Sequence, residues 1–277
     1  MMFAKGKKTA LVTGASSGMG KDIAKSLIKD GFQVYVAARN VEKMHDLAGL
    51  GARPLRLDVT SEDEIKAAVD TILAEVGGVD VLVNNAGFGL YGPVEEITLD
   101  EARYQFEVNL FGAARLTQLL LPSMRAKRAG TIVNITSMGG KIYSVLGAWY
   151  HATKHALEGW SDCLRIEVEQ FGIRVVIIEP GVIETGFGDA ASSNLLKRSQ
   201  HGPYAKLAKA VANSIANTYG KGTGSPGTVI ARVVSKAVRA RKPKTRYAAG
   251  KYAKMLLAMR RWLSDRTFDG IILSQTK

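Results

Sequence analysis

The chain has 277 residues, of which 46 % are hydrophobic and 23 % are charged, and its formal net charge is +13. Such a length and composition are typical of a globular protein with a large core and exclude a disordered or fibrous chain. No apolar run approaches the roughly 20 residues that a membrane-spanning helix needs.

Short apolar runs rich in β-branched residues alternate along the chain with segments of helical spacing. Because strands that alternate with helices of ten or more residues indicate a parallel sheet covered on both faces, the predicted fold is α/β. No break in composition precedes Gly181, so one domain over 1–277 is expected. Strands are predicted near 9–13, 31–37, 53–57, 80–84, 130–135, 173–179 and 245–249, and helices near 40–49, 61–76, 98–128, 149–171, 195–215, 228–241 and 251–263.

Three glycines, Gly14, Gly18 and Gly20, stand where the first predicted strand turns into a helix. At such a turn, backbone N–H groups and the positive helix end can hold a pyrophosphate with no side chain in the way. The spacing is G-x-x-x-G-x-G rather than G-x-G-x-x-G, and a glycine-rich turn on its own can be no more than a tight turn. Its place in a strand–helix–strand unit favours nucleotide binding.

The end of the second strand normally distinguishes the two nicotinamide dinucleotides, through an acid for the ribose 2′-OH or a cation for a 2′-phosphate. Here it reads Ala37-Ala38-Arg39-Asn40, with no acid. The alternative for Arg39 is an exposed loop charge, but a guanidinium binds phosphate well, so NADP(H) is favoured over NAD(H). Asp58, at the end of the third strand, could contact adenine or cap the next helix.

Tyr150 and Lys154 are four residues apart in a predicted helix and are expected to lie on one face, one turn apart. A phenol with a pKa of about 10 is a poor acid or base at neutral pH. An ammonium one turn away is expected to lower that pKa, which makes proton transfer with a carbonyl or alcohol oxygen feasible. Tyrosine and lysine at this spacing also occur by chance on surface helices.

The alternation of strands and helices lapses over residues 187–224, after the last long strand. A segment in that position is well placed to form a helical lid over a pocket at the strand ends. The stretch from Tyr219 to Gly227 is expected to be a flexible connector. Cys163, the only cysteine, excludes an internal disulfide and is expected to pack as a small apolar residue on a helix face.

Most of the positive charge lies near the C-terminus, where 18 Lys and Arg stand against two acids from residue 197 onward. The extension 250–277 contains a basic amphipathic segment with Trp262, which suits either a membrane interface or packing on its own domain or a partner subunit. The same charge could attract nucleic acid or an anionic substrate, or form a solvated face. Residues 1–8 lack the apolar core of a secretory signal, so a cytoplasmic location is expected, with a peripheral membrane contact as an open alternative.

The glycine turn together with Tyr150-x-x-x-Lys154 resembles the short-chain dehydrogenase/reductase family, and the resemblance covers nearly the whole chain. It implies a Rossmann-type, doubly wound parallel sheet of about seven strands in the order 3-2-1-4-5-6-7, in a three-layer αβα sandwich. The steroid- and retinoid-type branch is the most similar. The other matching motifs follow in order and spacing: Asn84-Asn85-Ala86-Gly87, Asn109, Ser137 thirteen residues before Tyr150, and Pro180-Gly181 with Thr185.

The resemblance implies a hydride-transfer site without a metal. Tyr150 would be the acid/base at the substrate oxygen, Ser137 would hydrogen-bond that oxygen, and Lys154 would bind the nicotinamide ribose. Asn109 would hold a water that links Lys154 to solvent. The implied cofactor contacts, besides Tyr150 and Lys154, are Gly14, Ser16, Ser17, Gly18, Met19, Gly20, Arg39, Asp58, Val59, Asn85, Ala86, Gly87, Val108, Pro180, Gly181, Val182, Ile183 and Thr185.

The residues expected to face the substrate are apolar or aromatic, which favours a hydrophobic ketone, aldehyde or alcohol such as a steroid, retinoid or acyl derivative. A 3-oxoacyl-thioester reductase is the alternative within this class. A non-catalytic nucleotide-sensing or nucleic-acid-binding protein on the same scaffold would have no chemical need for the four catalytic candidates, and the basic end lacks a known nucleic-acid motif. The resemblance also implies a homodimer or homotetramer through helices 98–128 and 149–171. The substrate-facing candidates are Phe88, Leu90, Tyr91, Tyr143, Val145, Leu146 and Phe187.

Overall fold

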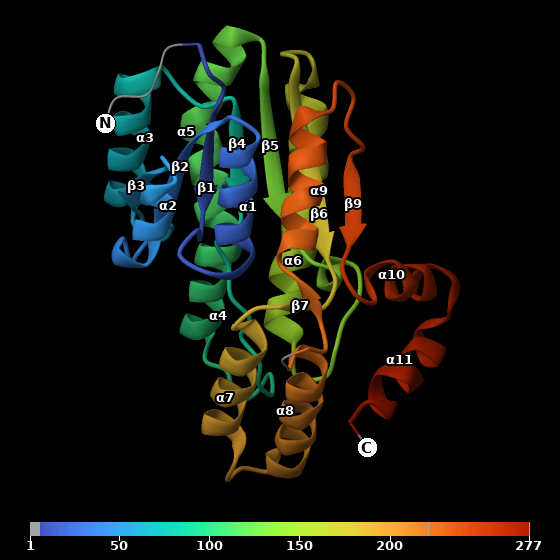
Figure 1. The fold of residues 1–277 in the computed structure, drawn as a ribbon. Helices are drawn as coiled ribbons and strands as arrows, with labels where there is room; N and C mark the ends of the chain where they lie inside the picture. The colour runs from blue at the N-terminus through green and yellow to red at the C-terminus, as the bar shows by residue number, and fades with distance from the viewer. Residues whose placement is uncertain (1–5, 221, 277) are drawn as a thin grey trace.

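A seven-stranded sheet forms the centre of the molecule, and all of its strand pairs are parallel (Figure 1). The computed structural model describes residues 6–220 and 222–276, so the predicted features at residues 1–5, Lys221 and Lys277 lie outside the described residues. The strand order is β3-β2-β1-β4-β5-β6-β9, which confirms the predicted Rossmann-type arrangement. The strands are β1 (Thr9–Thr13), β2 (Gln33–Ala38), β3 (Arg53–Arg56), β4 (Val81–Asn84), β5 (Gly130–Ile135), β6 (Ile173–Pro180) and β9 (Arg246–Ala249).

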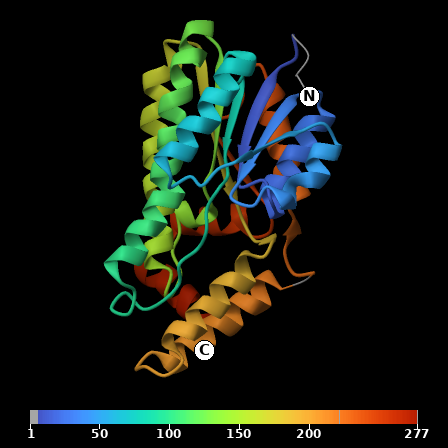
Figure 2. The same cartoon turned by 90° about the vertical axis from the view of Figure 1, so that its left-hand side faces the viewer.

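Helices cover both faces of the sheet and make the three-layer sandwich (Figures 1 and 2). Successive side chains of a strand point to opposite faces, so Ala10 and Val12 pack into one core while Leu11 packs into the other. Both cores are continuous and apolar. Because the strands are parallel, their carboxyl ends all lie at the same end of the sheet. The first core includes α1 (Gly18–Lys29), η1 (Glu42–Met44), α2 (His45–Gly49) and α9 (Thr228–Arg239), and the second includes α3 (Glu62–Val76), α5 (Gly112–Lys127) and α6 (Ala148–Glu169).

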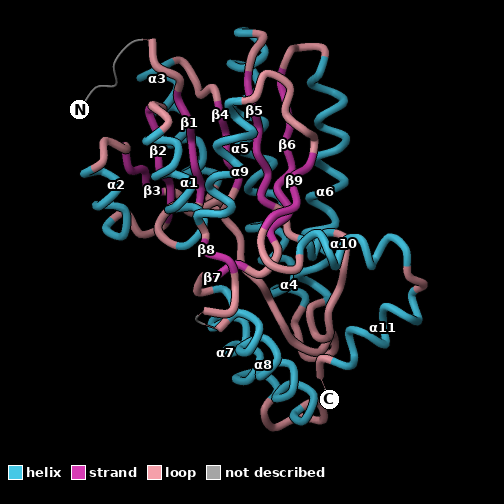
Figure 3. The backbone as a smooth tube through the Cα atoms, turned by 45° about the vertical axis from the view of Figure 1, so that its right-hand side comes forward, coloured by secondary structure: helices cyan, strands magenta, loops and turns pink. Residues whose placement is uncertain are grey.

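Several shorter elements gather at the carboxyl edge of the sheet (Figure 3). The predicted helix 98–128 is divided there into α4 (Leu99–Phe106), the π-helical turn η2 (Glu107–Phe111) and α5, and η3 (Met138–Gly140) follows β5. Two short strands, β7 (Ile183–Glu184) and β8 (Ser225–Pro226), pair in parallel. They tie the two ends of the segment that contains α7 (Phe187–Ser199) and α8 (Ala205–Tyr219) to each other.

Three further expectations about secondary structure are wrong. Residues 195–215 form parts of two packed helices, because Gly202 and Pro203 in the short connection interrupt the helical backbone. The expected connector 219–227 contains β8, and the chain ends in two helices, α10 (Ala253–Trp262) and α11 (Asp265–Ser274), of which only the first was predicted.

Cys163 also differs from its prediction, because it is exposed on α6 rather than packed against the core. Position 163 lies on the helix face opposite the buried residues Ser161, Leu164 and Val168. Among residues 6–220 and 222–276, no helix has the length and hydropathy needed to cross a bilayer.

Candidate active site

The glycine turn between β1 and α1 has a conformation that demands glycine. Gly14 and Gly18 adopt φ values of +66° and +52°, in the left-handed region that other residues rarely occupy. No side chain fits at Gly20, because an added Cβ would overlap the Gly14 carbonyl oxygen and would lie 2.5 Å from Asn85 Nδ2. The turn therefore leaves bare backbone at the start of α1, as a pyrophosphate site requires.

The end of β4 holds this turn in place. The Asn85 side-chain amide donates to the Thr13 carbonyl oxygen at 2.9 Å, and the backbone N–H groups of Asn85 and Ala86 both donate to Thr13 Oγ1 at 3.0 Å. The motif after the fourth strand is thus a clamp between two neighbouring strand ends. It sets the position of the glycine turn relative to the loop that begins at Gly87.

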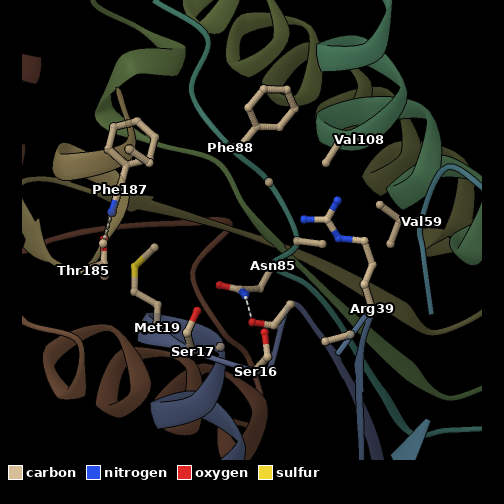
Figure 4. Close-up of a pocket in the computed structure, with 18 of the residues that line it drawn as sticks. Ser16, Ser17, Met19, Arg39, Val59, Asn85, Phe88, Val108, Thr185 and Phe187 are labelled. Carbon is tan, nitrogen blue, oxygen red and sulfur yellow. Dashed lines mark hydrogen bonds between the residues drawn. The ribbon is translucent and has the colours of Figure 1, made fainter. Parts of the chain in front are cut away.

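A cavity of about 680 Å³ opens above the glycine turn (Figure 4). Its size, its bare glycine floor and its position at the strand ends fit a nicotinamide dinucleotide. Most of the predicted cofactor contacts line it, together with two predicted substrate residues. The lining predicted from the sequence comprises Gly14, Ser16, Ser17, Gly18, Met19, Gly20, Arg39, Asp58, Val59, Asn85, Ala86, Gly87, Val108 and Thr185, with Phe88 and Phe187.

Arg39 reaches over the cavity from the end of β2, and its guanidinium is directed toward Val108 (Figure 4). Its Nη1 lies 3.5 Å from the hydroxyl of Tyr104 on α4. Lys43 lines the same part of the cavity, so two cations stand where a ribose substituent would lie. The sequence prediction missed Lys43 and Tyr104. A basic residue four positions after Arg39 was an available signal for Lys43, whereas nothing local points to Tyr104.

Asp58 lines the cavity but is partly engaged in its own turn. Its Oδ1 accepts hydrogen bonds from the Thr60 backbone N–H at 3.0 Å and from Thr60 Oγ1 at 2.8 Å. The helix that follows, α3, is capped by Ser61, which accepts from the Glu64 backbone N–H. Asp58 therefore does not cap α3, because Ser61 fills that role, and the contact with adenine is the alternative that stays open.

The segment after β6 contributes only part of what was predicted. Thr185 lines the cavity next to Gly18, whereas Pro180, Gly181, Val182 and Ile183 do not. The Gly181 N–H donates to the Ala249 carbonyl oxygen at 2.8 Å, and the Val182 N–H donates to the Lys251 carbonyl oxygen at 2.9 Å. These backbone groups are therefore used to join β6 to β9 and to the start of the C-terminal extension.

Tyr150 lies on the first turn of α6 and is 8 % exposed. It is not among the residues that line the cavity. Burial raises the pKa of Tyr150 above its ordinary value of 10, and a hydrogen bond with Ser137 opposes that rise. The expected lowering by Lys154 is therefore wrong in this arrangement. The phenol stays protonated at neutral pH, which is the form that a proton donor needs.

Lys154 is buried one turn further along α6, and its Nζ donates to the Ile135 carbonyl oxygen at 3.0 Å. Burial lowers the pKa of Lys154 to about 8, and the carboxylate of Glu158 acts in the opposite direction. An added Cβ on Gly87 would lie 3.6 Å from Nζ. The ammonium thus stands beside the loop that lines the cavity, although it does not contact the phenol.

Asn109 occupies the π-helical turn η2 and uses its side chain to hold the loop after β4. Its Oδ1 accepts from the Phe88 N–H at 3.0 Å, while its Nδ2 donates to the Phe88 carbonyl oxygen at 2.9 Å and to Thr153 Oγ1 at 3.0 Å. The predicted asparagine therefore joins three parts of the site: η2, the Phe88 loop and α6.

An aromatic cluster covers Tyr150 on the side away from the sheet. The rings of Phe187 and Tyr91 lie 5.4 Å and 5.8 Å from the Tyr150 ring, centroid to centroid. Val145, Leu146 and Tyr219 pack around the same cluster. Four of the predicted substrate residues, Tyr91, Val145, Leu146 and Phe187, are thus brought together at the tyrosine, and Tyr219 is a member that the sequence prediction missed.

The remaining predicted substrate residues lie apart from Tyr150. Tyr143 packs on Phe268 of α11 and donates its hydroxyl proton to Asp269 Oδ1 at 2.8 Å. Leu90 is buried with Ile97 in a separate cluster, against which Phe88 also packs. No group of His, Cys, Asp and Glu side chains among residues 6–220 and 222–276 could hold a metal ion.

The doubly wound sheet, the glycine turn, the half-buried Ser137 and the buried Tyr150 and Lys154 define the class of nicotinamide-dependent oxidoreductases with a Rossmann-type fold. Residues 8–195 match the family model for short chain dehydrogenases. The chain therefore belongs to the short-chain dehydrogenase/reductase family and is an NAD(P)-dependent oxidoreductase.

Three similar proteins illustrate this membership. An NADPH-dependent 3-dehydrocapnine reductase of Ornithobacterium rhinotracheale is 35 % identical over 280 residues, 97 % of each chain. A 3-ketodihydrosphingosine reductase of Bacteroides thetaiotaomicron is 40 % identical over 183 residues, 65 % of each chain. The crystal structure of a short-chain dehydrogenase from Streptomyces avermitilis superposes with a TM-score of 0.79 at 34 % identity, covering 98 % of this chain and 96 % of that one.

Proposed function

We propose that the protein is an NADP(H)-dependent reductase that interconverts a hydrophobic ketone or aldehyde and its alcohol. The observation that carries this proposal is the buried Tyr150 phenol, which is covered by the rings of Tyr91 and Phe187. Such a pocket offers an apolar surface to the substrate and one proton donor to its oxygen. Similarity to two proteins named as reductases of a 3-dehydro and a 3-keto compound supports the same reaction.

A nicotinamide held in this cavity would supply the hydride to the carbonyl carbon of the substrate. Tyr150 gives its proton to the oxygen of the carbonyl as negative charge develops there, and Ser137 donates a hydrogen bond to the same oxygen. Burial keeps the Tyr150 phenol protonated until that charge appears. Asn109 holds the Phe88 backbone, and Lys154 presents an ammonium beside Gly87, where the proposal places the nicotinamide ribose.

The preference for NADP(H) rests on Arg39 and Lys43. Both line the cavity near the end of β2, where a dinucleotide on this fold places its adenine ribose. Neither of the two residues directly after β2, Arg39 and Asn40, is an acid that could accept a hydrogen bond from a ribose 2′-OH. Two cations at this end of the cavity complement a 2′-phosphate.

The segment 187–224 is proposed to be a lid within a single domain. Arg198, near the end of α7, donates to the Tyr91 carbonyl oxygen at 3.1 Å and forms an ion pair with Glu101. The lid thereby connects to the loop after β4 on one side and to the β7–β8 pair on the other. Because Tyr150 lies under Phe187, a substrate reaches the phenol only when the lid moves.

A homodimer or homotetramer is proposed from the outer faces of α5 and α6, in a cytoplasmic protein. Phe111 at the start of this region and Ile166 on α6 are large apolar side chains that are 51 % and 66 % exposed. Pairing these helices between subunits would bury both. Size-exclusion chromatography with light scattering tests the proposal: Ile166→Glu should shift the protein to a smaller species, whereas Leu50→Glu should not.

The α10 surface is proposed to contact an anionic membrane surface peripherally. Trp262 is 78 % exposed, and Tyr252 and Met255 are exposed beside Lys254 and Arg261. An apolar face with surrounding cations complements an anionic bilayer. Flotation with phosphatidylserine vesicles should fall for Trp262→Glu but not for Leu50→Glu, and equal flotation of the two variants would remove this part of the proposal.

The reaction itself is tested by following NADPH oxidation with a panel of hydrophobic ketones, 3-oxoacyl thioesters and polar ketones. Tyr150→Phe should lower kcat by at least about a hundredfold, since it removes the proton donor. Tyr252→Phe, on the exposed α10 surface, is the matched control and should retain full activity. Turnover that survives Tyr150→Phe would refute the mechanism, and turnover of thioesters alone would replace the substrate class.

A further inference from the structure

His151, the residue after Tyr150, is held by two hydrogen bonds and is 7 % exposed. Its Nδ1 lies 2.9 Å from the Gly139 carbonyl oxygen, and its Nε2 lies 2.9 Å from Ser144 Oγ. The ring fits between two glycines: an added Cβ would come within 3.0 Å of Nδ1 at Gly139 and within 2.8 Å of Cδ2 at Gly147. One imidazole thus fastens both ends of the loop 138–147, which leads from β5 to α6.

The partners of the ring define its protonation. A carbonyl oxygen can only accept a hydrogen bond, so Nδ1 must carry a proton and donate to Gly139. Burial lowers the pKa of His151 to about 4, so the ring is neutral at neutral pH. Nε2 then has a free lone pair and accepts the proton of the Ser144 hydroxyl. Phenylalanine or leucine at this position would leave both groups without their partner.

Gly139 connects His151 to the candidate catalytic serine. While its carbonyl accepts from His151, its backbone N–H donates to Ser137 Oγ at 2.9 Å. A hydroxyl has one proton, so a serine oxygen that accepts from Gly139 keeps its own proton for a second partner. In the reaction proposed above, that partner is the substrate oxygen.

We propose that His151 is a positioning residue that acts through Gly139. It holds the Gly139 backbone so that the amide fixes Ser137 as a hydrogen-bond donor toward the reacting oxygen. This role rests on the proposed function, because it concerns the orientation of Ser137 in that reaction. The proposed reaction itself does not use His151, so positioning Ser137 accounts for a buried histidine at this place. Small displacements of a positioned group cost catalysis far more than binding.

Three substitutions separate the two hydrogen bonds. The amide nitrogen of His151→Asn falls near Nδ1 and can still donate to Gly139, whereas the longer His151→Gln reaches the place of Nε2 and keeps only the Ser144 contact. His151→Phe keeps the ring volume alone. We expect kcat to fall roughly a hundredfold for the Phe and Gln variants and to stay within about threefold of wild type for Asn. The KM for NADPH should stay the same in all three, because the loop 138–147 does not line the cavity.

A double-mutant cycle with Ser137→Ala distinguishes positioning from a general loss of structure. Because His151 acts through Ser137, His151→Phe should cost less than about twofold in kcat once the serine hydroxyl is gone. A full further loss in that background, or an unchanged kcat in His151→Phe alone, would overturn the inference while leaving the proposed function intact. Wild-type protein without Tyr150-dependent turnover would overturn the proposed function and this inference together.

Discussion

The ring of Phe187 lies 5.4 Å from the ring of Tyr150, so the first residue of α7 covers the proposed proton donor. Phe187 also contacts Tyr91 edge to face at 6.4 Å and Tyr219 at 5.7 Å. The proposed lid therefore contacts the tyrosine ring through the aromatic residue at its beginning, while Tyr91 covers the ring from the loop after β4. This relationship makes Phe187 the point at which lid position and substrate binding are coupled.

Phe187→Ala should weaken substrate binding more than it weakens cofactor binding. Removing a largely covered aromatic ring forfeits about 1.5–3 kcal/mol of apolar contact, so the KM for a hydrophobic ketone should rise at least about tenfold. Leu50→Ala, at a site 53 % exposed and away from the cavity, is the control. Steady-state kinetics with varied ketone and saturating NADPH provides the measurement. Equal KM values for the two variants would contradict a substrate pocket under Phe187.

Arg39→Ala should reduce the preference for NADPH over NADH. If the guanidinium binds a 2′-phosphate, its loss removes about 1.5–3 kcal/mol of charge-assisted hydrogen bonding, and the Kd of NADPH should rise by roughly tenfold to a hundredfold. The Kd of NADH should remain within about twofold. Arg103→Ala on α4, where Arg103 pairs with Asp100 and does not line the cavity, is the matched control in the fluorescence titration. If the Kd values of NADPH and NADH rose by the same factor, Arg39 would have a structural role instead.

Gly20→Ala should destabilise the protein and abolish cofactor binding. The new Cβ meets the Gly14 carbonyl oxygen and Asn85 Nδ2, both of which belong to the clamped turn, so the free energy of unfolding should fall by about 1–3 kcal/mol. Gly159→Ala in α6, where no atom lies within 4 Å of the new Cβ, should raise it by about 0.5–1 kcal/mol through helix propensity. Urea unfolding of the two variants tests both signs, and equal changes would contradict the packing of the turn.

Lys154→Met should be more stable than wild type at pH 7, yet inactive. Burial lowers the pKa of Lys154 from 10.5 to about 8, so the unfolded chain binds more protons than the folded chain between those values. The free energy of unfolding of the wild-type protein therefore rises with pH between about 8 and 10.5, as the penalty for burying the Lys154 ammonium disappears. The advantage of the methionine variant, up to about 3 kcal/mol at pH 7, should shrink toward pH 10. An advantage that is independent of pH would show that Lys154 is not buried as a cation.

The sequence predicted the sheet because its signals are local. Most strands of the sheet are short apolar runs, although β3 begins and ends with arginine. The glycines of the first turn are required by backbone conformation at Gly14 and Gly18 and by direct contact at Gly20. Strand order followed from the family that those motifs resemble, and the parallel pairing confirms it. The prediction of secondary structure was less accurate after residue 187, where Gly202 and Pro203 divide one predicted helix into two.

The environment of each site residue was decided only by the tertiary structure. The four-residue spacing of Tyr150 and Lys154 predicted an interaction between them, but the ammonium donates to the Ile135 carbonyl and burial raises the pKa of the phenol. The contacts of Tyr143 with α11 depend on a segment more than a hundred residues away in the chain.

By itself, therefore, the sequence determined most of the sheet and the glycine turn, because short-range backbone and side-chain preferences encode them, and its resemblance to a family supplied the candidate reacting groups. Only the tertiary structure decided which groups are buried, which accept or donate a particular proton, and that Phe187 covers Tyr150. The physical reason is that pKa values and hydrogen-bond partners depend on burial and on neighbours distant in sequence, which no local pattern specifies.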